Sequence, residues 1–489
     1  MAELKVWRGG RRFVLPFDPG TRLSDVLKGH GIEILQPCGG RGICGKCAVL
    51  IEGPAAPPTA AEQKAGVRLA CQAVLTGDSE VILPDARPME QIEMGSGNRL
   101  LPVSPMPGQY GAAVDIGTTT VVLSLYDLRT GACLCEHGML NPQSVVAADV
   151  MGRIGAALSG EQARLQAQII GALNALLSQA CAGAGIDVSR VESLVITGNT
   201  TMLYLLTGRN PVSLSRAPFI ADFLFDETLC ISGRKVYLPR CLHAFVGADI
   251  TCALISSGLC DSEKTSLLSD VGTNGELALW KDGELLITST AAGPAFEGAG
   301  ISCGCGSVAG AIDRVWIQNG RLAVHTIADA PAAGVCGSGL IDAVAAGLAL
   351  GEIDETGAMA GDAMALSPGL CLLPADIRAV QLAKAAVAAG VETLLETAGI
   401  TPDEVDSFLI AGGFGSHLNT ESAAFIGLFP PALARKAKAV GNASLTGAAC
   451  LLLDTSLQAR AQWIADRARH IPLGGNPSFN QHYMDQMMF

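Results

Sequence analysis

Four cysteines near the start of the chain have a spacing that could hold a metal cluster. Three lie in one glycine-rich loop and the fourth follows after 23 further residues: Cys38, Cys44, Cys47 and Cys71. Four thiolates can bind a [2Fe–2S] cluster, and glycines let backbone N–H groups approach its sulfides because they carry no side chain. The loop contains Gly39, Gly40, Gly42 and Gly45. The pattern therefore predicts a [2Fe–2S] site.

A tetrahedral zinc site is the main alternative for four cysteines, and structural thiols are a third. Zinc ribbons normally carry two C-x2-C pairs, whereas this chain has one such pair, one wider gap and one lone cysteine. The wider gap holds five residues, one more than in plant-type ferredoxins, and the loop is more similar to the adrenodoxin-type variant. The spacing thus favours [2Fe–2S] over zinc.

The elements around these cysteines are expected to form a small α+β domain. Hydrophobic patterns predict strands within 4–17, a helix over 23–30, a strand over 48–52, a short helix over 62–67 and a strand over 71–81. This order resembles the β-grasp fold of [2Fe–2S] ferredoxins. We expect the domain to cover residues 1–84, with a proline-rich linker over 85–110.

Two further stretches place an aspartate, a glycine and hydroxyl side chains at a tight turn between buried strands. The first is Asp-Ile-Gly-Thr-Thr-Thr at 115–120, and the second is Asp-Val-Gly-Thr-Asn-Gly-Glu at 270–276. Such an aspartate can hold Mg²⁺, while the following N–H and O–H groups bind phosphate oxygens. One Asp-x-Gly-Thr turn could be an ordinary hairpin. Two of them predict similar subdomains, the second beginning near residue 265, that face each other across a nucleotide cleft.

Three other stretches are expected to be strands that end in glycine or Asx loops: 194–201, 245–250 and 407–415. The last loop could lie against a purine ring. No P-loop sequence is present. Together these stretches resemble the phosphate and adenosine motifs of acetate and sugar kinases, heat-shock chaperone ATPases and actin (ASKHA). The resemblance implies a two-subdomain ATPase of the α/β ribonuclease H-like fold, which we expect over 111–475.

The C-terminal part supplies two further expectations. A helix is predicted over 380–398, capped by Asp376. Its packed face is expected to carry Leu382, Ala383, Ala386, Val387, Val391, Leu394 and Leu395. Residues 476–489 lack periodicity and are expected to be an arm or an interface segment.

Composition argues against several other classes of protein. The formal charge of −13 disfavours non-specific binding to nucleic acid or to an anionic membrane surface. The first 20 residues lack an apolar signal segment, and the most apolar window, 334–351, is too short and polar to span a bilayer. Sixteen cysteines without a signal peptide indicate thiols and metal ligands in a reducing cytoplasm. We therefore expect a cytoplasmic protein.

The whole chain resembles the reductive activators of corrinoid-dependent methyltransferases, which join an N-terminal [2Fe–2S] domain to an ASKHA ATPase. The resemblance is carried by the four cysteines, the two aspartate turns, Asn-Pro-Gln at 141–143, Gly-Asn-Thr-Thr-Met at 198–202 and Gly-Gly-Phe-Gly at 412–415. It implies an enzyme that hydrolyses ATP and returns a Co(II) corrinoid to Co(I) with an electron from its cluster. The implied partners are a methyltransferase corrinoid protein and an upstream electron donor. Many relatives carry a middle domain that we expect to be absent here, and a homodimer stays open.

The resemblance also implies roles for particular residues. Asp115 and Asp270 would hold Mg²⁺ and its water. The phosphates of ATP would contact Thr118, Thr119, Thr120, Gly272, Thr273 and Asn274. The adenosine would contact Gly412, Gly413 and Gly415. Glu297 and Asp249 are candidates for orienting the attacking water, although a structural role is favoured for each.

Three rival functions stay open. The first is an activator of another enzyme, such as a 2-hydroxyacyl-CoA dehydratase, but those activators share a [4Fe–4S] cluster across a dimer and lack a ferredoxin domain. A small-molecule kinase with a redox-sensing domain and a non-enzymatic electron carrier are the others. Cys303, Cys305 and Cys336 raise the question of a second metal site, and small thiols in glycine loops are the favoured interpretation.

Overall fold

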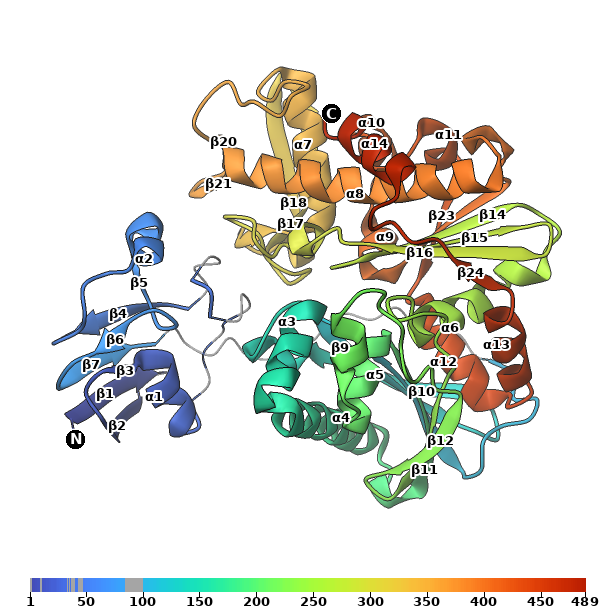
Figure 1. The fold of residues 1–489 in the computed structure, drawn as a ribbon, viewed down its shortest axis with the longest axis horizontal. Helices are drawn as coiled ribbons and strands as arrows, with labels where there is room; N and C mark the ends of the chain where they lie inside the picture. The colour runs from blue at the N-terminus through green and yellow to red at the C-terminus, as the bar shows by residue number, and fades with distance from the viewer. Residues whose placement is uncertain are drawn as a thin grey trace.

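The chain folds into a small N-terminal sheet domain and a larger part built on two six-stranded sheets (Figure 1). The computed structural model describes residues 2–8, 11–32, 34, 36, 40–42, 47–83 and 100–489. Two of the four predicted cluster ligands, Cys38 and Cys44, lie outside these ranges, as does most of the expected linker.

The N-terminal domain is a five-stranded sheet in the order β2-β1-β7-β4-β5, packed against one helix. Its elements are β1 Ala2–Arg8, β2 Arg11–Phe17, β3 Thr21–Arg22, α1 Leu23–Gly29, β4 Ala48–Glu52, α2 Ala60–Ala65, β5 Arg68–Leu69, β6 Val74–Leu75 and β7 Ser79–Ile82. Alternating residues of β1, Leu4 and Val6, are buried with Leu23 and Leu27 of α1. The alternation along β1 is the pattern that predicted strands within 4–17.

The single strand predicted over 71–81 is wrong, because that segment turns twice. Gln72 N and Ala73 N both donate to Leu69 O, which forms a tight turn directly beside Cys71. The chain then makes the short strand β6 before β7. The turn keeps the fourth cysteine at the edge of the sheet, next to Cys47.

The first half of the larger part contains a sheet in the order β10-β9-β8-β11-β13-β12. Its strands are β8 Tyr110–Ile116, β9 Thr120–Asp127, β10 Ala132–Leu140, β11 Val191–Gly198, β12 Glu227–Ile231 and β13 Arg234–Leu238. The helices are α3 Val150–Ala156, α4 Gln162–Ala184, α5 Thr200–Thr207 and α6 Ala248–Ser257. Helix α4 packs on β9 and β10 and buries Leu165, Ile169 and Leu176 there.

The second half contains a sheet in the order β23-β22-β14-β15-β16-β24. Its strands are β14 Ser266–Val271, β15 Gly275–Lys281, β16 Glu284–Thr290, β22 Ser407–Ala411, β23 Ala437–Gly441 and β24 Ala468–His470. A side sheet is made by β17 Ala311–Gln318, β18 Arg321–Thr326 and β19 Gly334–Val335, and a ribbon by β20 Met364–Ser367 and β21 Leu370–Leu372. The helices are α7 Gly337–Leu350, α8 Pro374–Ala398, α9 Gly412–His417, α10 Thr420–Phe425, α11 Pro431–Ala434, α12 Ala443–Leu453, α13 Leu457–Ala465 and α14 Pro477–Asp485.

The two halves repeat the same strand arrangement around their aspartate turns. Strand β8 forms an antiparallel hairpin with β9 and pairs in parallel with β11 on its other side. Strand β14 does the same with β15 and β22. Asp115 and Asp270 therefore lie at equivalent places, each at the carboxyl end of the strand between a hairpin partner and a parallel neighbour.

Helix α12 ties the halves together, because it follows β23 of the second half yet packs on β8 and β11 of the first. It also crosses α6 at close range. A Cβ added at Gly447 of α12 would lie 2.0 Å from the backbone oxygen of Cys252 in α6. The crossing thus requires glycine at this position.

Several local predictions are wrong. Residues 245–250 do not form a strand; Gly247 precedes α6 and approaches the backbone of Asn199 so closely that an added Cβ would lie 2.5 Å from its Cα. The predicted glycine loop after β22 is the short helix α9.

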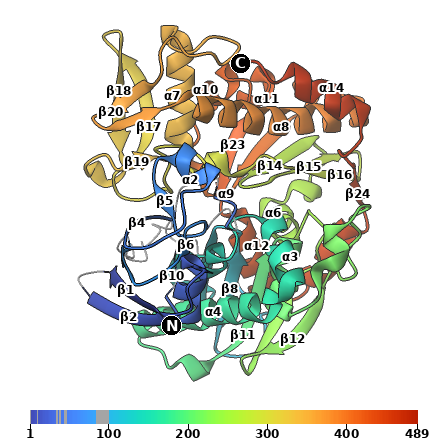
Figure 2. The same ribbon diagram turned by 60° about the vertical axis from the view of Figure 1, so that its left-hand side comes forward.

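In the C-terminal part, Leu382 is 37% exposed and so does not lie on the packed face of α8. That helix begins at Pro374, and Asp376 accepts a hydrogen bond from Leu373 N in its first turn. The tail forms helix α14, which lies along α8 (Figure 2).

One helical stretch among the described residues, Val150–Ala184, is long and apolar enough to cross a membrane by length and composition. It is interrupted by Gly160, whose φ is 100°, and its α4 part packs on the first sheet.

Replacing Gly447 by Ala is expected to destabilise the larger part of the chain, because the new methyl group must push α12 away from α6. Overpacking of this kind typically costs about 1–3 kcal/mol. The matched control is Gly171→Ala in α4, where an added Cβ has no neighbour within 4 Å and helix propensity favours Ala. Thermal unfolding should show a lower Tm for Gly447→Ala and an equal or higher Tm for Gly171→Ala. Equal Tm values for the two variants would contradict the close crossing.

Candidate functional site

Cys47 and Cys71 lie together in the N-terminal domain. Both are buried, and their Sγ atoms are 3.3 Å apart. The pKa of Cys71 is lowered to about 6, chiefly by the hydrogen bond with Cys47 and also by hydrogen bonds with Gln72 and the backbone of Gly42, although burial opposes the shift. A lowered thiol pKa favours the thiolate, which is the form that binds metals.

Gly40 and Gly42, which precede Cys47 in the sequence, lie against Gln72, the residue that follows Cys71. Gln72 Nε2 donates to Gly40 O at 2.7 Å, and a Cβ added at Gly42 would lie 2.9 Å from Gln72 Cγ. Two adjacent thiols with a glycine backbone packed beside them fit the donor set that an iron–sulfur cluster needs. Cys47 and Cys71 are the described residues that would hold it, and the cluster when bound supplies one-electron transfer. Cys38 and Cys44 stay predicted ligands.

Carboxylates from both halves meet where the two aspartate turns face each other. Burial and the charge of Asp270 raise the pKa of Asp115 to about 7, against a hydrogen bond with the Asn442 side chain. Burial, Asp115 and Asp270 raise the pKa of Asp249 to about 8. Burial and Glu297 raise the pKa of Asp270 to about 6. These carboxylates are partly buried and repel one another, and a cation would relieve the repulsion.

The chemistry of this set suits a hard divalent cation, which prefers oxygen ligands. Across the described ranges no three His, Cys, Asp or Glu side chains are grouped closely enough to hold a metal ion alone. Mg²⁺ usually keeps several waters and binds through one or two carboxylates plus phosphate oxygens. The residues present therefore fit a metal that arrives with a phosphate ligand. Asp115 and Asp270 would hold it, and it would supply neutralisation of phosphate charge.

The hydroxyl groups predicted to bind phosphate lie at the same place. Thr119 Oγ1 donates to Glu297 Oε2 at 2.5 Å, and Thr273 Oγ1 donates to the same oxygen at 2.9 Å. Thr118 Oγ1 accepts from Asn199 Nδ2 at 3.1 Å. The structure thus brings together threonines from both turns, although they lie about 150 residues apart in the sequence.

The other predicted phosphate residues shape these turns. Gly117 N donates to Thr120 O, and Gly272 N donates to Asn274 O, both at 2.8 Å. The Asn274 side chain also hydrogen bonds to Glu276. Thr120, Gly272 and Asn274 therefore take part in the backbone hydrogen bonds that close the two hairpin turns.

The three glycines predicted to contact adenosine are not equivalent. Gly412 has a φ of 85°, and a Cβ there would lie 2.7 Å from Asp270 Oδ1. Gly413 is exposed, with no atom within 4 Å of an added Cβ. Gly415 is buried, and a Cβ there would lie 2.5 Å from the Ile410 side chain. Gly412 is thus packed on Asp270, Gly413 is open to a ligand, and Gly415 packs internally.

Sequence reasoning missed Arg153, which supports the first turn. This side chain of α3 is fully buried, and it donates to Thr118 O at 2.5 Å and to Ala147 O at 3.0 Å. Burial lowers its pKa to about 10, so it stays charged at neutral pH. A lone arginine among apolar residues at 150–157 was the available signal. The contact of Asn442 with Asp115 was not predicted either, since the two residues are remote in sequence.

Two ion pairs join the N-terminal domain to α3 and the turn that follows it. Lys28 Nζ is 2.7 Å from Glu161 Oε1, and Arg41 of the cysteine loop is 3.8 Å from Asp149 Oδ2. Asp149 caps α3, the helix that carries Arg153. Figure 1 shows α3 on the side of the first half that faces the N-terminal domain. Exposed ion pairs contribute about 1 kcal/mol or less each, so this contact is weak and reversible.

The cysteines considered for a second metal site do not form one among the described residues. Cys336 is buried and its thiol donates to Ile312 O at 3.4 Å. Cys305 N donates to Val335 O, and a Cβ added at Gly334 would lie 2.7 Å from Cys305 Sγ. Cys305 and Cys336 thus lie beside tight glycine turns, and small thiols in glycine loops stay the favoured interpretation.

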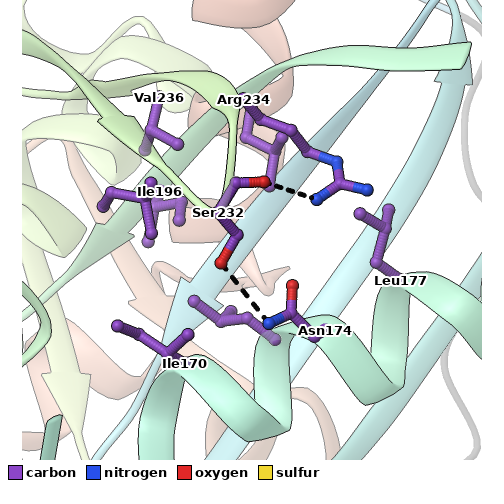
Figure 3. A pocket seen from close by; sticks show the side chains of 10 residues that line it. Ile170, Asn174, Leu177, Ile196, Ser232, Arg234 and Val236 are labelled. Carbon is purple, nitrogen blue, oxygen red and sulfur yellow. Dashed lines mark hydrogen bonds between the residues drawn. The ribbon is translucent and has the colours of Figure 1, made fainter. Parts of the chain in front are cut away.

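A small hollow elsewhere in the first half lies between α4 and the sheet (Figure 3). Its walls are mainly apolar side chains of α4, β11 and β13. At its rim Asn174 donates to Ser232 Oγ and Arg234 donates to Ser232 O. It contains none of the predicted site residues, so it has no part in the chemistry at the aspartate turns.

Three family models match the chain. The 2Fe-2S iron-sulfur cluster binding domain matches residues 8–76, the RACo middle region matches 110–262, and the C-terminal ASKHA domain of RACo matches 264–489. The expectation that a middle domain is absent is therefore wrong with respect to this family's middle region, which coincides with the first half of the larger part.

Two relatives and one solved structure align with most of the chain. The corrinoid activation enzyme RamQ of Eubacterium limosum is 35% identical over 437 residues, which cover 81% of this chain and 73% of RamQ. The [Co(II) methylated amine-specific corrinoid protein] reductase of Methanosarcina barkeri is 27% identical over 423 residues, covering 78% and 77%. A solved structure of a reductive activator for a corrinoid, iron-sulfur protein has a TM-score of 0.73 and 26% identity, covering 100% of this chain and 98% of that one.

Replacing Cys47 by Ser is expected to abolish cluster binding, because it removes one of the two adjacent thiols. The unmodified chain, prepared anaerobically, should contain two iron atoms and show visible absorption, as one [2Fe–2S] cluster requires. The control Cys303→Ser should retain both. Iron that exceeds two atoms per chain, or that disappears in the Cys303 variant, would contradict a single cluster in the N-terminal domain.

The raised pKa values predict that the metal-free chain loses stability as pH rises. Protonated carboxyl groups stabilise the fold fully below their unfolded pKa near 4, and that stability is lost as pH passes through about 6 to 8. The free energy of unfolding should fall by about 1.4 kcal/mol per pH unit for each group that ionises. In EDTA, Tm should fall between pH 5.5 and 8.5, and less steeply in Asp115→Asn.

The control for that series is Asp187→Asn, because Asp187 is an exposed aspartate whose pKa is lowered by hydrogen bonds from Ser189. It should leave the slope unchanged. A flat Tm profile for the unmodified chain would show that the carboxylates of the two turns do not repel one another.

Proposed function

Because this chain belongs to the RACo family, with a 2Fe-2S cluster binding domain followed by an ASKHA domain, we propose that it is an ATP-dependent reductive activator. It hydrolyses ATP and transfers one electron from its [2Fe–2S] cluster to the Co(II) corrinoid of a methyltransferase corrinoid protein. The cobalt is thereby returned to Co(I). An upstream donor restores the electron, and the reaction takes place in the cytoplasm.

A thermodynamic reason supports joining these two modules in one chain. Plant-type [2Fe–2S] clusters lie near roughly −400 mV, and each 59 mV of uphill one-electron transfer costs about a factor of ten in the equilibrium constant. ATP hydrolysis is useful only if the acceptor is harder to reduce than the donor. Co(II) corrinoid is such an acceptor in the proposed reaction.

The residues of the two turns have distinct tasks in hydrolysis. Asp115 and Asp270 hold Mg²⁺ with the phosphates, since they are the carboxylates at the ends of β8 and β14. The hydroxyls of Thr119 and Thr273 donate to phosphate oxygens. Arg153 holds the first turn in place through Thr118 O and places positive charge behind it.

The observation that carries the proposal is the presence in one chain of two adjacent thiols, one of them with a lowered pKa, and two opposed aspartate turns. The relatives do not favour a small-molecule kinase, because RamQ is a corrinoid activation enzyme and the Methanosarcina barkeri protein is a corrinoid protein reductase. An electron carrier without ATPase activity would not need carboxylates of raised pKa from both halves.

Asp115→Ala is expected to abolish ATP-dependent cobalt reduction, because Mg²⁺ loses one of its two protein ligands. The visible spectrum of the cluster should stay intact, since Asp115 lies in the other domain. The assay mixes the anaerobic chain, a chemical reductant and a Co(II) corrinoid protein, with and without ATP, and follows Co(I) absorbance. Normal activation by the variant would overturn the assignment of Asp115.

A further inference from the structure

Glu297 connects the phosphate turns of the two halves. Its Oε2 accepts a hydrogen bond from Thr119 Oγ1 at 2.5 Å and another from Thr273 Oγ1 at 2.9 Å. Thr119 follows β8 and Thr273 follows β14. One carboxylate oxygen therefore holds together two loops that belong to different sheets.

The backbone around Glu297 is fixed by close contacts. Glu297 ends the 3-10 helix Pro294–Glu297, between Gly293 and Gly298, both of which have positive φ. A Cβ added at Gly298 would lie 2.2 Å from Cys305 O, and one added at Gly337 would lie 1.9 Å from Phe296 O. Neighbouring backbone segments therefore pack closely against the chain on both sides of Glu297, and this packing fixes the position of its carboxylate.

The second carboxylate oxygen of Glu297 also lies against a phosphate turn. A Cβ added at Gly272 would be 3.2 Å from Glu297 Oε1. The charge of Glu297 raises the pKa of Asp270, so the carboxylate stands beside the predicted metal ligand as well. Both oxygens of Glu297 thus occupy the region in which phosphate oxygens are proposed to bind.

A threonine hydroxyl has one proton to donate. When that proton is donated to Glu297, it is withheld from a phosphate oxygen. Carboxylate and phosphate are both anionic acceptors, and they compete for the same donors.

We infer that Glu297 is an internal competitor of phosphate at this site. Bound polyphosphate takes the hydroxyls of Thr119 and Thr273 from Glu297, and loss of phosphate returns them. The inference rests on the proposed ATP function and deepens it. When the two hydroxyls donate to phosphate instead of Glu297, the hydrogen bonds that join the two halves at Glu297 are replaced. Phosphate binding and the contact between the halves are therefore coupled. Glu297 acts here as a positioning residue, which differs from orienting the attacking water.

The test is equilibrium binding of ADP to the full chain in EDTA, where a role as a metal ligand has no effect. Glu297→Ala frees both hydroxyls and should bind ADP about tenfold more tightly, an order of magnitude set by two charge-assisted hydrogen bonds that need not be broken. A water-orienting residue would leave this affinity unchanged. Glu297→Gln keeps the shape of the side chain and should show a smaller gain.

Glu276→Gln is the matched control for the loss of a carboxyl group beside a phosphate turn. Glu276 is buried in β15, and burial with the charges of Asp249 and Asp270 raises its pKa well above the usual range; it hydrogen bonds to Asn274 rather than to a threonine. This substitution should tighten ADP binding less than Glu297→Ala does. Equal gains in the two variants, or no gain in Glu297→Ala, would overturn the competition. Failure of every protein, including the unmodified chain, to bind ADP would overturn the nucleotide site of the proposed function along with it.

Discussion

Repulsion between partly buried carboxylates of the two halves is the constraint on which the rest of the site depends. Asp115 and Asp270 end equivalent strands, and the charge of Asp270 raises the pKa of Asp115. Such a pair is unfavourable unless a cation or a proton neutralises it. Two polar side chains offset this repulsion. Asn442 hydrogen bonds to Asp115, and Arg153 places a positive charge behind the first turn. A bound metal and polyphosphate would turn this repulsion into binding energy for both halves at once.

The scaffold that holds the carboxylates is a repeated three-strand unit joined by one crossing helix. Each aspartate lies between a hairpin partner and a parallel strand, so two turns of similar shape face each other. Helix α12 returns from the second half to pack on the first, and Gly447 permits its close approach to α6. A movement of one half relative to the other would therefore change the contact of α12 with α6 and the hydrogen bonds of Glu297 with Thr119 and Thr273. The weak ion pairs near α3 connect the N-terminal domain to the first half.

Features set by local sequence could be predicted, and features set by remote contacts could not. The matches to the family models confirm the overall fold class. This class could be predicted because alternating apolar residues and repeated Asp-x-Gly-Thr turns are short-range signals. Residues 245–250 were predicted to be a strand, but Gly247 packs on the backbone of Asn199 and directly precedes helix α6. That contact joins segments remote in sequence. Glycines after β22 argued against a helix, and tertiary packing produced α9. Arg153 was missed because its partner, Thr118 O, is a backbone atom in another element.

The central claim is that ATP hydrolysis at the two turns drives one electron from the N-terminal domain to cobalt. Its most direct test is a single-turnover experiment with the reduced, reductant-free chain and a Co(II) corrinoid protein. Phosphate release and Co(I) absorbance would be followed in the same sample. The account predicts that both appear together after ATP is added, with one reducing equivalent lost from the cluster for each Co(I) formed. Co(I) formation to the same extent without nucleotide, or phosphate release that continues unchanged with no electron transferred, would contradict it.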